Sequence, residues 1–136
     1  MLLKKYKISI ITVCFNSEKT IKKTLQSVQN QKYNKIEHVI IDGKSNDKTL
    51  SIVKKFQHIK KIISEKDHGI YYAMNKGLKI ATGEIIGFLN SDDFYANNYV
   101  LKNVSKLFKE DSSLEACYAD LVYVDALDTS KIIRFW

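Results

Sequence analysis

Strand-like and helix-like segments alternate along this chain, and their order restricts the fold more than any other feature of the sequence. Residues 8–15 form a continuous apolar run rich in β-branched side chains, which is typical of a strand covered on both faces. Three further strands are expected at residues 36–41, 61–64 and 84–89. Because helix-like segments separate these strands, the pattern predicts an α/β fold with a parallel sheet and right-handed crossovers.

The helix expected between residues 70 and 81 has the clearest pattern. Its apolar residues recur at the spacing of one helix face, and they are Ile70, Ala73, Met74, Gly77, Leu78 and Ala81. Asn16 or Ser17 is expected to cap a helix after the first strand, and Asp47 to cap a helix after the second. A further helix is expected around residues 100–108.

The end of the chain contains two more strand-like runs, residues 117–124 and 132–136, joined by a polar turn. A length of 136 residues without internal repeat, low-complexity segment or proline indicates one domain over residues 1–136. Since the last expected strand runs to the final residue, Trp136, we expect this domain to be truncated.

Basic residues are concentrated in the first half of the chain. Residues 1–66 contain fifteen lysines and five acidic residues, and the formal net charge of the whole chain is +7. Such a surface could face phosphates or an anionic membrane, or could simply be a solvated lysine-rich face. We expect no nucleic-acid partner, because no helix has a basic stripe interleaved with aromatic residues and no zinc-finger or RNP pattern is present.

The two cysteines, Cys14 and Cys117, lie within apolar, strand-like runs. We expect both to be buried free thiols in a reducing compartment. The sequence shows no signal peptide, and no stretch approaches the length needed to span a bilayer. These features favour a cytoplasmic protein, with contact at the inner face of the cell membrane as an additional expectation.

Polar side chains gather where the expected strands end, at Asn16, Asp42, Ser45, Asp47, Asp67, Asp92 and Asp93. Because ligands of parallel sheets bind beyond the carboxyl ends of the strands, these residues are expected to form one acidic rim. Crowded carboxylates repel one another, and a cation would relieve that repulsion. Oxygen ligands without nearby cysteine or histidine select Mg²⁺ or Mn²⁺, usually together with substrate phosphates. The rim therefore predicts a metal-dependent site for a nucleoside diphosphate or triphosphate, since both glycine-rich phosphate motifs are absent.

Several residues at the rim have a second interpretation. Asp47 is best explained as a helix cap. Phe15 either stacks on a nucleotide base or packs in the core. His68 is interpreted as a loop residue rather than as a general base, and Lys76 could reach a phosphate.

Four stretches together resemble glycosyltransferase family 2, the inverting enzymes of the GT-A fold. They are residues 9–16 (SIITVCFN), 42–49 (DGKSNDKT), 67–77 (DHGIYYAMNKG) and 82–93 (TGEIIGFLNSDD). Each stretch is weak alone, but their order at successive strand ends is specific. The resemblance covers the donor-binding part of the family's domain and implies a three-layer α/β/α fold with a mainly parallel sheet.

The resemblance also implies roles for single residues in a nucleotide-sugar site. The first motif contributes Thr12, Phe15 and Asn16, with Phe15 at a base-stacking position. Asp42 matches the acid that recognises the base, although Gly43 stands where the family has a second aspartate.

The later motifs supply the diphosphate and metal end of the implied site. Asp67 matches a donor-site aspartate, with Asn75 and Lys76 on the helix behind it. Asp93 is expected to bind the metal, and Asp92 the metal, the ribose or the diphosphate. The catalytic base is unknown and expected to be absent from this chain, because none of Asp120, Asp125 and Asp128 matches the family's pattern.

The expected function is transfer of a sugar, with inversion, from a UDP- or GDP-sugar to a saccharide or lipid-linked acceptor in bacterial cell-surface polysaccharide synthesis. Mg²⁺ or Mn²⁺ is the expected cofactor, and self-association is a further expectation. Two alternatives stay open. A nucleotidyltransferase would prefer a nucleoside triphosphate, and a non-catalytic module would bind nucleotide sugar without turnover. The isolated chain is expected to be inactive in transfer.

Overall fold

The central sheet contains four parallel strands in the order β3-β2-β1-β4. The computed structural model describes residues 5–136, so the first four positions of the expected domain lie outside the described residues. The strands are β1 (Ile8–Cys14), β2 (Ile36–Asp42), β3 (Lys61–Ser64) and β4 (Ile85–Phe88). Every residue of β1 is buried, which agrees with its continuous apolar run.

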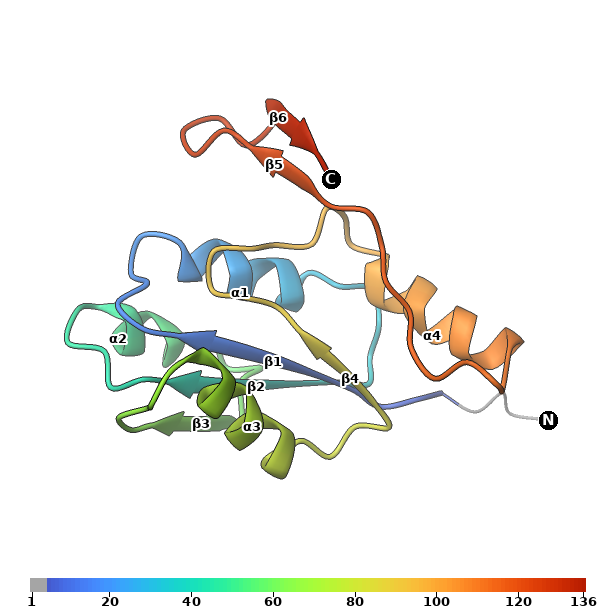
Figure 1. Ribbon diagram of the computed structural model, residues 1–136, viewed down its shortest axis with the longest axis horizontal. Helices are drawn as coiled ribbons and strands as arrows, with labels where there is room; N and C mark the ends of the chain where they lie inside the picture. Colours follow the sequence, from blue (N-terminus) through green and yellow to red (C-terminus); the bar gives the residue numbers. More distant parts are fainter. Residues whose placement is uncertain (1–4) are drawn as a thin grey trace.

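Helices cover both faces of this sheet, which gives the predicted three layers (Figure 1). They are α1 (Ile21–Gln29), α2 (Thr49–Val53), α3 (Ile70–Ile80) and α4 (Val100–Glu110). Alternate side chains of β1 point to opposite faces. Ile10 and Cys14 face α1, α2 and α4, whereas Ile11 and Val13 face α3. The α/β/α fold with a parallel sheet is thus confirmed.

Helix α3 approaches the sheet closely because Gly77 has no side chain. A Cβ atom at Gly77 would lie 2.4 Å from Cγ2 of Ile11. The predicted apolar face is only partly buried: Ala73 and Gly77 are buried, whereas Ile70 and Leu78 are 48% and 44% exposed. The reason is that α3 stands alone on its face within residues 5–136, so no second helix covers its flanks.

Neither predicted cap stands at the N-cap position of its helix: Lys48 rather than Asp47 precedes α2, although Asp47 still accepts a hydrogen bond from the first residue of that helix. Asp47 Oδ1 accepts the N–H of Thr49 at 2.9 Å, at the start of α2. Helix α1 begins later than expected, at Ile21, and has no side-chain cap. The backbone carbonyl of Ser17, rather than its hydroxyl, accepts the N–H of Ile21 at 2.9 Å.

The last two strands form a hairpin that is separate from the sheet. Strands β5 (Val122–Val124) and β6 (Ile132–Phe135) pair antiparallel with each other and lie outside the three layers, where Lys23 of α1 donates a hydrogen bond to Thr129 in the hairpin turn (Figure 1). The strand expected at residues 117–124 is therefore shorter than predicted. Cys117 is exposed, which contradicts the expected burial, because the segment before β5 forms no strand and is almost entirely exposed. Cys14 is buried and free, as predicted.

Candidate functional site

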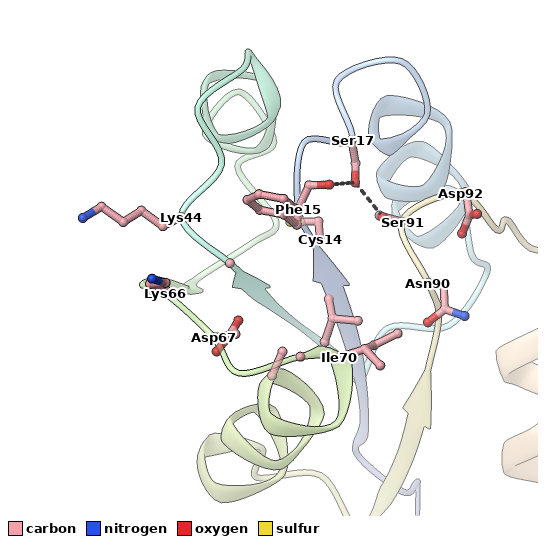
Figure 2. A pocket seen from close by; sticks show the side chains of 14 residues that line it. Cys14, Phe15, Ser17, Lys44, Lys66, Asp67, Ile70, Asn90, Ser91 and Asp92 are labelled. Carbon is pink, nitrogen blue, oxygen red and sulfur yellow. Dashed lines mark hydrogen bonds between the residues drawn. The ribbon is translucent and has the colours of Figure 1, made fainter.

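A cavity of about 680 Å³ lies at the carboxyl ends of the parallel strands (Figure 2). The loops that follow the four strands supply most of its wall, and the end of β1 and the start of α3 supply the remainder. The lining residues are Val13, Cys14, Phe15, Ser17, Gly43, Lys44, Lys66, Asp67, Gly69, Ile70, Ala73, Asn90, Ser91 and Asp92. Its volume is in the usual range of small-molecule sites.

Phe15 stands at this cavity with 63% of its surface exposed. Packing in the core, one of the two interpretations from sequence, is therefore excluded. The ring lies beside Gly43, where an added Cβ would be 3.5 Å from Phe15 Cδ2. The missing side chain at Gly43 thus leaves an aromatic ring open to a ligand.

Two serine hydroxyls connect the loops that follow the neighbouring strands β1 and β4. Ser17 Oγ and Ser91 Oγ are 2.9 Å apart, and Ser17 Oγ donates to the carbonyl of Phe15 at 3.2 Å (Figure 2). The loop after β1 is thereby tied to the loop after β4. We did not predict either serine as a site residue, although Ser91 belongs to the polar run that contains Asp92.

Asp67 lies in the wall of the cavity and is neutralised from behind. Its carboxylate accepts a hydrogen bond from Lys76 Nζ, which also pairs with Glu65 at 2.8 Å. The bonds to Asp67 and Glu65 raise the pKa of Lys76. Lys76 does not line the cavity. Its ammonium group pairs with these two carboxylates and does not make the phosphate contact that the sequence suggested.

Asp42 and Thr12 lie below the cavity and are fully buried. Asp42 accepts hydrogen bonds from Ser45 Oγ at 2.5 Å and from Ser64 Oγ at 2.6 Å, and Thr12 Oγ1 is 3.0 Å from His38 Nε2. These side chains point toward the α1 and α2 face, because every second residue of a strand does so. In this conformation they shape the strand ends and do not line the cavity.

Three other polar residues also lie outside the cavity wall. Asn16 Oδ1 accepts the N–H of Asn46 at 3.0 Å, which joins the loops after β1 and β2. Asn75 is on the exposed side of α3. The second oxygen of Asp47 accepts the N–H of Glu18 at 3.0 Å. The single acidic rim expected from sequence is therefore divided, and only Asp67 and Asp92 of its carboxylates line the cavity.

The turn after β4 contains oxygen atoms of the kind that bind a hard divalent cation. Asp92 lines the cavity, and Asp93 follows it with an exposed side chain. Partial desolvation of the Asp93 carboxyl, together with the charge of Asp92, raises its pKa, and a hydrogen bond with Asn90 opposes this rise. The buried Oδ1 of Asn90 has no hydrogen-bond partner. Carboxylate and amide oxygens are the ligands that Mg²⁺ and Mn²⁺ prefer, so these residues fit such an ion.

The protein alone does not form a closed metal cage there. Within residues 5–136, no group of three or more histidine, cysteine or acidic residues is placed so that it could hold a metal ion. An ion at this turn would therefore need further ligands, and phosphate oxygens of a bound nucleotide would supply them.

A family model described as Glycosyl transferase family 2 matches residues 9–132 of this chain. The chain belongs to this family. The match confirms the resemblance drawn from the four sequence motifs, and it includes every predicted site residue.

A curated relative from Escherichia coli is the UDP-Glc:alpha-D-GlcNAc-diphosphoundecaprenol beta-1,3-glucosyltransferase WfgD. It is 36% identical over 79% of this family 2 chain and 44% of its own length. An uncharacterized glycosyltransferase from Haemophilus influenzae is also 36% identical, over 72% of the chain and 41% of the relative. The chain thus spans about two fifths of the length of these relatives.

Solved structures confirm the GT-A fold. TarS 1–349 of S. aureus, in complex with UDP-GlcNAc, is 34% identical to this chain with a TM-score of 0.71, and the match covers 76% of this chain and 31% of the TarS 1–349 chain. The mannosyltransferase PcManGT from Pyrobaculum calidifontis, in complex with GDP-Man and Mn²⁺, is 26% identical to this chain with a TM-score of 0.72. The match covers 77% of this chain and 33% of the PcManGT chain.

Proposed function

We propose that the cavity binds the nucleoside diphosphate of a UDP- or GDP-sugar, and that the sugar is then transferred with inversion in bacterial cell-surface polysaccharide synthesis. One observation carries this proposal. The cavity combines an open aromatic ring, Phe15, with the oxygen donors of Asn90 and Asp92. Family membership supports it, as do the UDP-GlcNAc and GDP-Man bound to solved members.

In this proposal, different residues of the cavity bind different parts of the nucleotide-sugar donor. Phe15 stacks on the base, and Asp92, Asp93 and Asn90 hold Mg²⁺ or Mn²⁺ beside the diphosphate. A divalent ion there would offset the charge that develops on the leaving diphosphate. Asp67 faces the donor and is oriented by Lys76.

The other predicted donor residues act indirectly in this proposal. Thr12 and Asp42 fix the strand ends, and Asn16 joins two loops, so that Phe15 and Gly43 keep their places. Asn75 has no contact with the cavity in this conformation.

The reaction needs a base on the acceptor side. The base removes a proton from an acceptor hydroxyl, whose oxygen bonds to the anomeric carbon as the opposite bond to the diphosphate breaks. Among residues 94–136, no carboxylate lines the cavity. Asp125 and Asp128 accept backbone N–H groups within the hairpin turn. We therefore propose that the base comes from outside this chain.

The acceptor in this proposal is a saccharide carried on a lipid. The Escherichia coli relative is named for a diphosphoundecaprenol-linked acceptor, which supports action at the inner face of the cell membrane. Within residues 5–136, no helix has the length and apolar character needed to cross a bilayer. Membrane contact would then come through the acceptor lipid or through surface residues, and self-association is a further part of the proposal.

Calorimetry with UDP, GDP and UTP, in Mn²⁺ and in chelator, tests the proposal. We expect a nucleoside diphosphate to bind in Mn²⁺ and to lose about tenfold or more of its affinity in chelator. Asp93→Asn should remove this metal-dependent part, whereas Asp120→Asn, an exposed carboxylate away from the cavity, should not. Equal affinity with and without metal would contradict the metal site. A strong preference for UTP would favour a nucleotidyltransferase.

A further inference from the structure

A second concave surface lies at the opposite end of the sheet from the cavity. It is a groove of about 950 Å³, formed by residues that precede β1 and β2 and by one side of α4. Strand β1 has seven residues, so about 23 Å of sheet separates the two ends. The groove is therefore not an extension of the cavity, and nothing in the proposed function uses it.

The walls of this groove are strongly basic. They contain Lys5, Lys32, Lys102, Lys106 and Lys109, which come from three separate segments and are all exposed. The three lysines of α4 follow one another at i, i+4 and i+7, so they form one stripe along the helix.

Little negative charge balances these lysines. The one acidic residue in the groove lining is Glu110, and it pairs with Lys106 at 3.5 Å. The other four lysines have no ion pair within the described part of the chain. Ammonium groups gathered around a concave surface raise the local concentration of anions.

The floor of the groove is rigid and internally satisfied. Gln31 is buried; it accepts the N–H of Leu101 at 3.0 Å and donates to the carbonyl of Asn97 at 2.7 Å. The hydroxyl of Tyr33 is 3.0 Å from that of the buried Ser105. These bonds tie the segment before β2 to α4, so the two basic walls keep a fixed separation.

We propose that this groove binds a flexible polyanion that carries phosphate groups along its chain. Lysines on facing walls fit a chain that lies between them, whereas a flat bilayer would meet the rims only. The single aromatic residue of the lining is Tyr33, whose partly buried ring packs against the core cluster between the sheet and α4. The groove therefore lacks a free ring on which nucleic-acid bases could stack, which distinguishes this polyanion from single-stranded DNA or RNA.

Binding of inorganic polyphosphate to the protein, followed by calorimetry, tests the proposal. If four ammonium groups displace counterions, the association constant should fall about fifty-fold between about 50 mM and about 200 mM salt. Replacing the α4 stripe in Lys102→Gln/Lys106→Gln/Lys109→Gln should weaken binding about tenfold or more and flatten the salt dependence. UDP affinity, measured in parallel, should stay unchanged.

The matched control removes three exposed lysines elsewhere, in Lys22→Gln/Lys54→Gln/Lys55→Gln, and keeps the same net charge as the stripe variant. An equal loss of polyphosphate binding in both variants would overturn the proposal, because general attraction would then explain it. Tighter binding of oligothymidylate than of polyphosphate would overturn it in favour of nucleic acid. Binding to phosphatidylglycerol vesicles without binding to polyphosphate would overturn it in favour of a membrane surface.

Discussion

His38 is enclosed in the fold between two polar partners. Its Nε2 is 3.0 Å from Thr12 Oγ1, and its Nδ1 is 3.1 Å from His58 Nε2. Burial, and to a lesser extent the charge of His58, lowers the pKa of His38 from 6.5 to about 3. The ring is therefore neutral in the folded protein at any ordinary pH.

This depressed pKa predicts loss of stability on mild acidification. Below pH 6.5, His38 binds a proton in the unfolded chain, whereas in the folded chain it stays neutral down to about pH 3. The free energy of unfolding therefore falls as the pH falls through this window. We expect a loss of about 2 kcal/mol from His38 between about pH 7.5 and about pH 5. Urea denaturation of His38→Gln, followed by circular dichroism, should show a flatter pH dependence. The exposed His68→Gln serves as control, and an unchanged slope in His38→Gln would refute the assignment.

Phe15 offers a second test at the residue scale. Because its ring is 63% exposed, Phe15→Ala should leave the melting temperature nearly unchanged. Loss of base stacking should weaken UDP or GDP binding by about 1–3 kcal/mol. Phe135→Ala, another exposed aromatic residue but on β6, should alter neither quantity. Nucleotide affinity that survives Phe15→Ala would show that the ring does not stack.

Single residues also show where sequence reasoning stops. The motifs identified Phe15, Asp67 and Asp92, and all three line the cavity. They also suggested Asp42, which points to the other face, because a motif gives the end of a strand but not the side on which its last residue lies. The Ser17–Ser91 bridge joins two distant loops and has no signature in either.

Elements were more predictable than side-chain directions. The bounds of the sheet strands lie within one residue of those expected, because a doubly covered parallel strand is a continuous apolar run. The predicted start of α1 was wrong because a backbone turn at Ser17 replaces the expected side-chain cap. The strand at residues 117–124 was overextended because an apolar run without packing partners has no reason to pair along its full length.

The contact between α3 and β1 gives a prediction at this scale. Alanine at Gly77 gains up to about 1 kcal/mol of helix propensity. Its Cβ would meet Ile11 Cγ2 at 2.4 Å, and such overpacking costs about 1–3 kcal/mol. We therefore expect Gly77→Ala to lower the free energy of unfolding, measured by urea denaturation with circular dichroism. Lys79→Ala, at an exposed site of the same helix, should change it by less than about 0.5 kcal/mol. A more stable Gly77→Ala variant would show that α3 can move away from the sheet.

At the scale of the whole molecule, the proposed function separates donor binding from the chemistry of transfer. Its cavity is bounded by the ends of all four sheet strands, whereas the residues after α4 lie in the exposed segment and the hairpin. Both carboxylates that line the cavity have proposed tasks, Asp67 with Lys76 and Asp92 with the metal and diphosphate. A third carboxylate that could take the acceptor proton is not found in the cavity wall across residues 5–136.

We accordingly expect this chain to bind donor but to transfer no sugar over multiple turnovers. Slow hydrolysis of the donor by water is compatible with the cavity. The measurement is product formation with UDP- and GDP-sugars and lipid-linked saccharides, with the longer Escherichia coli relative and its named substrates as positive control. Multiple turnovers would place the base within these residues, and Asp125 and Asp120 would be the first to replace.

The hairpin has a consequence for how this protein is observed. The chain has one tryptophan, Trp136, which directly follows β6 and is 71% exposed. Its indole is near the guanidinium of Arg134 and belongs to none of the three apolar clusters of the sheet. Its emission spectrum should therefore resemble that of indole in water before and after the sheet unfolds. Intrinsic tryptophan fluorescence therefore reports on the C-terminal hairpin of this molecule and is nearly insensitive to unfolding of its core.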